Sequence, residues 1–228
     1  RDVAPSRGLG DVYKRQELSG AIKEGRKWLI PDETIHMNHF AKNKSLPIGV
    51  SDFKLATTGY YYVDKTLMIR DFLDKKPMVS LFTRPRRFGK TLNMSMLNYF
   101  FSNHYSEKSE IFEKLSIWNS VKYRKLQGAY PVIFISFADV KQGNYKDAVQ
   151  KVKKIIADVY RQYRYLMDYP DFTVADRRKL SDMTDRIDDV TAQDSLKDLS
   201  YFLSEYYKKK VIILLDEYDT PMPVSYTH

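Results

Sequence analysis

Gly89, Lys90 and Thr91 stand between two apolar segments and are the residue types of a phosphate-binding loop. Residues 78–83 form a short apolar run with the length of a buried strand, and residues 92–101 carry apolar side chains mostly at helical spacing. Where a strand, a loop and a helix follow one another in this way, loop N–H groups surround a phosphate at the helix N-terminus, and the helix dipole favours the anion. The spacing therefore predicts a nucleotide phosphate site.

Each residue type in this predicted site has a chemical role. Gly89 lets the backbone approach a phosphate because it has no Cβ. Lys90 would reach the β- and γ-phosphates, and the Thr91 hydroxyl would complete a Mg²⁺ site. The strict motif requires glycine at the position of Arg84, so these residues alone fit a basic turn before a helix about equally well. The predicted nucleotide-binding residues are Arg86, Arg87, Phe88, Gly89, Lys90 and Thr91.

A second apolar run, residues 211–215, ends directly in two carboxylates. It lacks polar alternation, which is typical of a strand buried on both faces in a parallel sheet. Ligands bind at the carboxyl ends of such strands, where Asp216 would hold Mg²⁺ and Glu217 would orient or deprotonate an attacking water. The alternative is a solvated loop, but the order of the two motifs favours a nucleotide site. Its predicted catalytic residues are Glu217 and Lys90, and its predicted metal ligands are Thr91 and Asp216.

Further elements must position these residues. Apolar side chains predict a buried strand over residues 130–137, with Ser136 or Asp139 at its carboxyl end either facing the site or capping a loop. Helical spacing predicts helices over residues 67–73, 106–118, 146–167 and 195–207. The alternation of strand and helix predicts an α/β fold, a three-layer P-loop NTPase sheet that is mostly parallel and incomplete at its C-terminus.

The segment before the loop also carries structural signals. Tyr61 and Val63 alternate as in an edge strand, and Asp64 is placed to cap the helix that follows. Residues 169–192 are polar and acid-rich, which predicts a loop or a peripheral helical excursion.

Composition limits the classes of protein. The 228 residues contain 43% hydrophobic side chains, enough for a core, and no cysteine, which excludes disulfides and cysteine metal sites. The formal charge of +9 favours polyanionic partners such as nucleotides or nucleic acid. No apolar run approaches the roughly 20 residues of a membrane helix, and no signal-peptide core is present. We therefore expect a cytoplasmic protein without membrane contact.

The two ends of the chain differ from its centre. Residues 1–16 and 224–228 resemble translated adapter or vector sequence, so we expect them to be non-native tails. Residues 17–44 are a winged-helix remnant or a linker: residues 21–31 are similar to the end of excisionase-type winged helix-turn-helix proteins, in which a hairpin lies beside the DNA-reading helix. Arg26 and Lys27 would then meet phosphates and Trp28 would pack inward, whereas read-through upstream of a start at Met37 explains the segment equally well.

The series LPIGVSDF, YYYVDKT, LFTRPRRFGKT, YPVIFISF and VIILLDEYDTP resembles the AAA-ATPase-like family of bacterial proteins. Full-length members also carry a C-terminal PD-(D/E)XK nuclease-like domain. The resemblance covers residues 45–223, the expected domain, and it implies nucleotide roles for Lys90, Thr91, Asp216 and Glu217. In that family an arginine-rich motif replaces the strict one, which accounts for Arg84.

These patterns predict a domain that uses ATP and Mg²⁺ and, in the complete protein, hydrolyses ATP by in-line attack of water. Arg86 or Arg87 would add a phosphate contact or act on a neighbouring molecule, or both would form a basic rim that steers ATP. The main alternative is a nucleotide-dependent switch that gates an attached nuclease or DNA-binding domain. A third reading is a kinase with a small acceptor. We expect this chain alone to hydrolyse ATP weakly or not at all, and nucleic acid to be bound through missing or N-terminal regions.

Overall fold

The computed structural model describes residues 22–24, 27–29, 44–83 and 88–220. The chain divides into two units, Arg1–Ser45 and Leu46–His228, which are taken separately below. Among the described residues, no helix is both long enough and apolar enough to cross a membrane.

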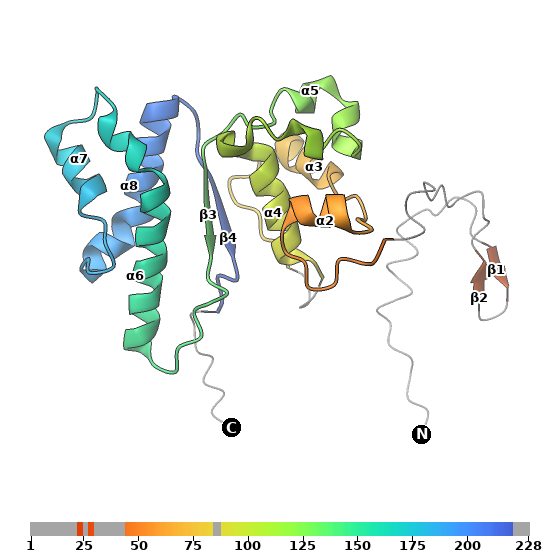
Figure 1. Ribbon diagram of the computed structural model, residues 1–228, viewed down its shortest axis with the longest axis horizontal. Coiled ribbons are helices and arrows are strands. Elements are labelled where there is room, and N and C mark those ends of the chain that lie inside the picture. The colour runs from red at the N-terminus through yellow and green to blue at the C-terminus, as the bar shows by residue number, and fades with distance from the viewer. Residues whose placement is uncertain (1–21, 25–26, 30–43, 84–87, 221–228) are drawn as a thin grey trace. The chain divides into compact units, whose positions relative to one another are not determined.

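The first unit contains an antiparallel pair of strands, β1 (Ile22–Glu24) and β2 (Lys27–Leu29). Ile22 pairs with Leu29, and Lys23 pairs with Trp28 (Figure 1). A hairpin is what the winged-helix resemblance implies for this segment. The predicted DNA contact of Arg26 lies outside the described residues, and the role of Lys27 stays a prediction.

The second unit is a mixed α/β structure, and its described part holds seven α-helices and one parallel pair of strands. The helices are α2 (Phe53–Gly59), α3 (Leu67–Lys75), α4 (Lys90–Phe101), α5 (Val121–Arg124), α6 (Tyr145–Gln162), α7 (Val174–Ser181) and α8 (Asp189–Tyr207). The strands are β3 (Val132–Ser136) and β4 (Ile212–Asp216). Short 3₁₀ turns are η3 (Asn103–Tyr105), η4 (Ser109–Ile111), η5 (Ser116–Asn119) and η6 (Arg164–Asp168).

Polar side chains fix where several helices begin. Asp52 accepts a hydrogen bond from the Leu55 N–H and caps α2, and Asn144 does the same for α6 through the Asp147 N–H. Thr173 begins α7 with a reciprocal capping box. These caps satisfy N–H groups that the first helical turn leaves without intrahelical partners.

The two parallel strands pair in register over their whole length, from Val132 opposite Ile212 to Ser136 opposite Asp216. The turn before β3 requires glycine at position 128, because its φ is +65° and an added Cβ would lie 2.4 Å from the Ser106 Cα. Both strands end on the same side of the unit, where α4 begins (Figure 1). This arrangement brings residues 90–91 and 216–217 to one end of the sheet.

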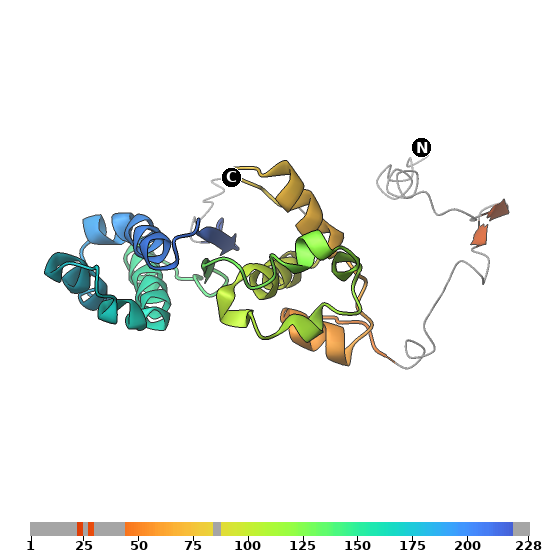
Figure 2. The ribbon, with the colours of Figure 1, turned by 90° about the horizontal axis from the view of Figure 1, so that it is seen from above.

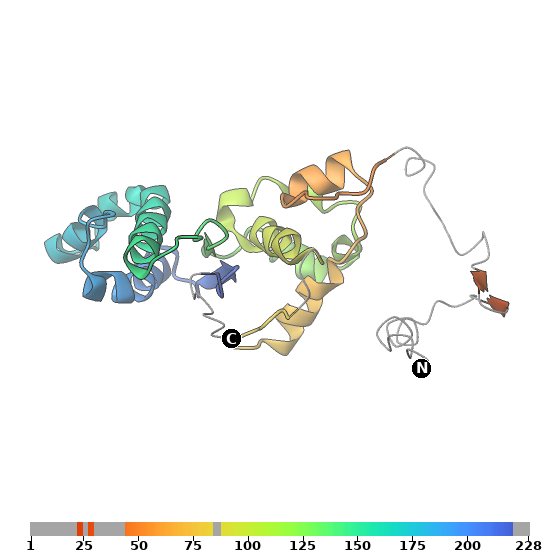
Figure 3. The same ribbon diagram turned by 90° about the horizontal axis from the view of Figure 1, so that it is seen from below.

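Helices lie on both sides of the strand pair. Helices α6, α7 and α8 gather on one side, and α2 to α5 lie on the other (Figures 2 and 3). Ile133 and Ile135 belong to the first buried cluster, with Ile156, Leu199 and other residues of the α6–α8 group. The residues of the second cluster, which is rich in phenylalanine, include Phe53, Phe100, Phe101, Phe112, Val132 and Leu214. β3 is therefore packed on both faces, whereas β4 contributes side chains to the second cluster only.

The expectation of a buried strand at residues 78–83 is wrong for this structure. The segment forms no strand, and Val79 and Leu81 are 87% and 64% exposed. The run over residues 211–215 is a strand, as predicted, but it is not buried throughout, because Ile213 and Leu215 are 43% and 36% exposed. In both runs the exposed apolar side chains have no further strand or helix packed over them among the described residues.

Several predicted boundaries also change. Residues 106–118 form the 3₁₀ turns η4 and η5 and no α-helix, and residues 61–65 form no strand. Asp64 does not cap α3, whose N-cap is Thr66. The Asp64 carboxylate instead accepts hydrogen bonds from the Thr66 N–H at 2.8 Å and the Ser116 N–H at 2.7 Å. These bonds connect the segment before α3 to η5. Helix α6 ends at Gln162 in place of residue 167, and α8 begins at Asp189 in place of residue 195.

Candidate functional site

The candidate site begins at the N-terminus of α4. Gly89 is the N-cap residue with φ +72°, and its carbonyl accepts the first helical hydrogen bond, from the Asn93 N–H at 2.9 Å. Among the described residues, no heavy atom lies within 4 Å of the position that a Gly89 Cβ would occupy, so the backbone is open toward that part of the structure. Lys90 and Thr91 are the first two helical residues, where backbone N–H groups and the helix dipole favour an anion.

Most of the other residues that the sequence assigns to the loop are not among the described residues. Arg86 and Arg87 fall outside the described residues, so their predicted phosphate contacts stay predictions. Phe88 is described, and its side chain is exposed.

Asp216 is the buried centre of the site. It is the last residue of β4 and 3% exposed, and the Ser136 hydroxyl lies 3.5 Å from its Oδ2 atom. The Thr91 hydroxyl also hydrogen-bonds to this carboxylate. Burial raises the pKa of Asp216, and the hydrogen bonds from Thr91 and Ser136 oppose that rise. Two residues 125 positions apart in the sequence are thus brought together as an oxygen donor pair.

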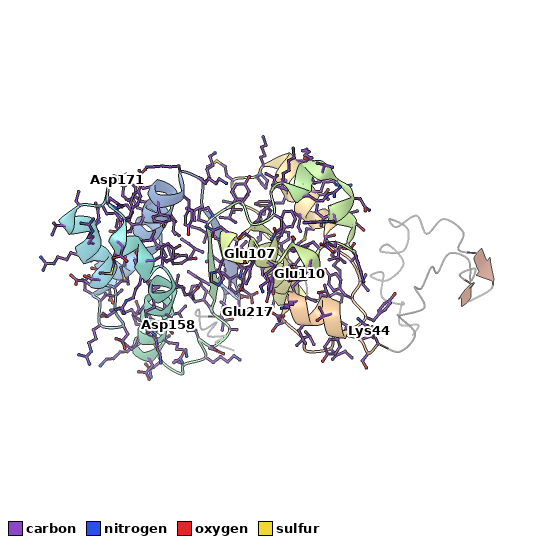
Figure 4. All side chains as sticks on the ribbon, turned by 45° about the horizontal axis from the view of Figure 1, so that its top comes forward. Lys44, Glu107, Glu110, Asp158, Asp171 and Glu217 are labelled. Atoms are coloured by element: carbon purple, nitrogen blue, oxygen red, sulfur yellow. The ribbon has the colours of Figure 1, made fainter. Side chains whose placement is uncertain are left out.

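Glu217 follows at once, in an unusual backbone conformation. Its φ is +53°, in the left-handed region that a residue with a Cβ rarely adopts. The Thr220 N–H donates to the Glu217 carbonyl at 3.0 Å, and the Thr220 hydroxyl donates to the Glu217 carboxylate at 3.2 Å. This turn holds the half-buried Glu217 side chain at the carboxyl end of β4 (Figure 4).

Comparisons with known proteins bear on this geometry. An uncharacterized protein in the vnfD 5' region of Azotobacter chroococcum mcd 1 is 30% identical over 115 residues, which are 50% of this chain and 21% of that protein. The chain therefore covers about a fifth of the length of that relative. No solved structure matches. A family model described as predicted AAA-ATPase matches residues 47–228.

The chain belongs to this AAA-ATPase-like family. The family match spans the loop around Lys90 and the carboxylates at residues 216 and 217. It supports nucleotide use in general.

In this AAA-ATPase-like chain, oxygen ligands for a divalent cation come from few side chains. No group of three or more His, Cys, Asp or Glu side chains gathers among the residues that the structure describes. The Asp216 carboxylate and the Thr91 hydroxyl nevertheless form the kind of hard oxygen pair that Mg²⁺ takes, because this ion keeps several waters and needs few protein ligands.

The sequence does not clearly predict a place in the site for two residues, Ser136 and Thr220. The sequence leaves Ser136 either in the site or as a loop cap, and the structure shows both contacts. Its hydroxyl accepts a hydrogen bond from the Ala138 N–H at 3.4 Å and lies 3.5 Å from Asp216 Oδ2. Thr220 was not identified at all. Its position three residues after Glu217, with Asp219 between, is a turn spacing that could have indicated the contact.

Proposed function

We propose that residues 45–223 form an ATP-binding P-loop domain and that the complete protein hydrolyses ATP with Mg²⁺. The observation that carries the proposal is the contact of Thr91 with the buried Asp216 carboxylate beside the open Gly89 backbone. A phosphate site and a hard oxygen pair at one end of a parallel strand pair are the two parts that nucleotide hydrolysis requires. Family membership supports the nucleotide.

The roles follow from the positions of the residues. The N–H groups at the start of α4 and the Lys90 ammonium would bind the phosphates and offset their developing charge. Thr91 and Asp216 would hold Mg²⁺, which supplies charge neutralisation at the phosphate oxygens. Glu217 would orient or deprotonate the attacking water, and Arg86 or Arg87 would add a phosphate contact. In this proposal, further strands complete a three-layer P-loop sheet around β3 and β4.

A nucleotide-dependent switch is the second candidate, and the Thr220 contact favours it. The Thr220 hydroxyl occupies one acceptor position of the Glu217 carboxylate, which leaves fewer positions at which this carboxylate can hold an attacking water. Such a module would bind ATP, hydrolyse it slowly and gate an attached nuclease or DNA-binding domain. The longer relative leaves room for such a domain.

Titration calorimetry with ATP and Mg²⁺ tests nucleotide binding. We expect saturable binding by the chain and a loss of at least about 100-fold in affinity in Lys90→Ala, because a charge-assisted phosphate contact is removed. Lys197→Ala is the matched control, since Lys197 is an exposed lysine of α8. Equal binding by Lys90→Ala and the unmodified chain would contradict the proposed phosphate site.

Glu217→Gln distinguishes the two candidates in the complete protein. A hydrolase would lose turnover by about 100-fold or more while it keeps its affinity for ATP, because only the water-activating group changes. A switch would bind ATP equally well in both forms and show little turnover to lose. Single-turnover hydrolysis measured beside binding separates these results.

A further inference from the structure

A second feature of the second unit is a cavity of about 280 Å³ beside α4, lined by both polar and aromatic side chains. Thr91, Ser95 and Asn98 line it, and their spacing of four and three residues places them on one helix face. The volume lies just below the roughly 300 Å³ at which pockets for small ligands begin. It therefore suits a ring system with a sugar better than a whole nucleoside triphosphate.

Two tyrosine rings that pack closely against each other line this cavity and form its aromatic wall. The rings of Tyr99 and Tyr105 lie 4.3 Å apart between centroids at an interplanar angle of 31°. The Tyr99 hydroxyl donates to Asp52 Oδ2 at 3.0 Å, which fixes that ring. Burial, together with this bond, raises the pKa of Tyr99 to about 12, so the hydroxyl stays a donor at neutral pH. Phe134 of β3 also lines the cavity.

The polar atoms of the cavity favour an uncharged ligand. Among the described residues that line it, none is a lysine or an arginine, and Asp52 contributes a carboxylate that disfavours a phosphate group beside it. Ser95 Oγ accepts the Phe53 N–H at 3.0 Å, which leaves the serine hydrogen available to a ligand. The Asn98 amide can present a donor and an acceptor side by side.

We infer that this cavity binds a nucleoside, with the base against the tyrosine rings and its polar edge at the Asn98 amide. An asparagine amide matches the adjacent donor and acceptor of adenine, and aromatic rings stack on bases. The ribose hydroxyls have Ser51 and Ser95 as partners. The aromatic wall and the amide thus recognise the base, while the hydroxyl groups recognise the sugar.

The nucleoside has two sources that share this chemistry. Thr91 belongs both to the cavity and to the proposed nucleotide site, and Asn98 lies seven residues further along α4, a rise of about 10 Å. The cavity could receive the base of the same ATP, or a separate nucleoside beside it. The inference itself does not rest on the proposed phosphate site, since a nucleoside has no phosphate.

The test is adenosine binding to the chain by titration calorimetry. We expect saturable binding that Lys90→Ala leaves unchanged and that Asn98→Ala weakens about 5- to 100-fold, the range of a lost paired base contact. Asn98→Asp removes the amide donor at constant size and should weaken binding likewise. Asn119→Ala, at an exposed asparagine of η5 outside the cavity, is the control and should bind normally. Thermal unfolding by circular dichroism establishes that the variants are folded.

The outcomes separate the proposals. Failure of adenosine to bind, or full binding by folded Asn98 variants, would overturn the nucleoside site whatever Lys90→Ala does to ATP. Loss of adenosine binding in the Asn98 variants supports the site even if ATP binding proves insensitive to Lys90. Displacement of adenosine by ADP in the unmodified chain but not in Lys90→Ala would identify the base of the same nucleotide. Simultaneous binding of both ligands would identify a separate nucleoside.

Discussion

Two apolar runs of nearly equal length have opposite fates in this unit. Residues 132–136 form β3, pair in register with β4 and bury Ile133 completely between the strand pair and the α6–α8 group. Residues 78–83 form no strand, and Leu81 is largely exposed. Both runs carry β-branched, leucine or phenylalanine side chains, so local composition does not separate them.

The two runs differ in the strands and helices that pack against them. β3 has a parallel neighbour on one edge and helices on both faces, so the backbone groups on that edge are paired and its side chains are packed. The run at residues 78–83 has no strand partner among the described residues. An apolar run becomes a buried strand only when a partner supplies the hydrogen bonds, and that partner comes from a distant part of the chain.

The largest expected effect is on stability, and it tests this comparison directly. Ile133→Ala should lower the free energy of unfolding by about 2 to 4 kcal/mol, because it opens a cavity in a packed cluster. Leu81→Ala, at the exposed run, should change it by less than about 0.5 kcal/mol. Urea unfolding followed by circular dichroism measures both. Equal losses would mean that the run at residues 78–83 is packed in solution.

A smaller effect is expected at the hydrogen bond that fixes β3 to α6. The Tyr163 hydroxyl, just after α6, donates to the Val132 carbonyl at the start of the strand. Tyr163→Phe should cost about 1 kcal/mol, since a buried acceptor loses its partner. Tyr145→Phe, at an exposed tyrosine, is the control and should have no measurable effect. If the two variants unfold at the same urea concentration, this bond does not hold β3 in place.

The smallest expected effect has the opposite sign and concerns the end of β4. Burial raises the pKa of Asp216, so folding favours its protonated form and the charged form costs stability above that pKa. Asp216→Asn should therefore stabilise the ligand-free chain by about 0.5 kcal/mol at pH 7. The gain should shrink as the pH falls through the raised pKa of the folded state, and it should vanish below the ordinary pKa of 3.8, where the carboxyl is protonated in both states.

Urea unfolding at several pH values between 4 and 7 measures this change, with Asp219→Asn at an exposed neighbour as the control. A loss of stability in Asp216→Asn at pH 7 would show that the carboxylate has a favourable partner in the unliganded protein.

The sequence predicts some residues of the site and of the cavity better than others. Lys90 and Thr91 were assigned from their position before a helical pattern, and α4 does begin at Lys90. Asp216 was assigned to the end of a strand, and β4 does end there. Thr220 and the wall of Tyr99 and Tyr105 were not found, because their contacts depend on a turn and on the packing of η3 against α4. Side-chain contacts of this kind have no periodic signal.

By itself the sequence determined the elements with a strong local pattern: helix α4 after Gly89, the long amphipathic helices α6 and α8, and the strands β3 and β4. It also determined which residue types are available for phosphate and metal chemistry. Three features depend on the tertiary structure: Thr91 contacts Asp216, the run at residues 78–83 stays exposed, and a cavity forms beside Asn98. Local patterns reflect interactions of residues near in sequence, whereas these outcomes depend on which distant segments supply partners.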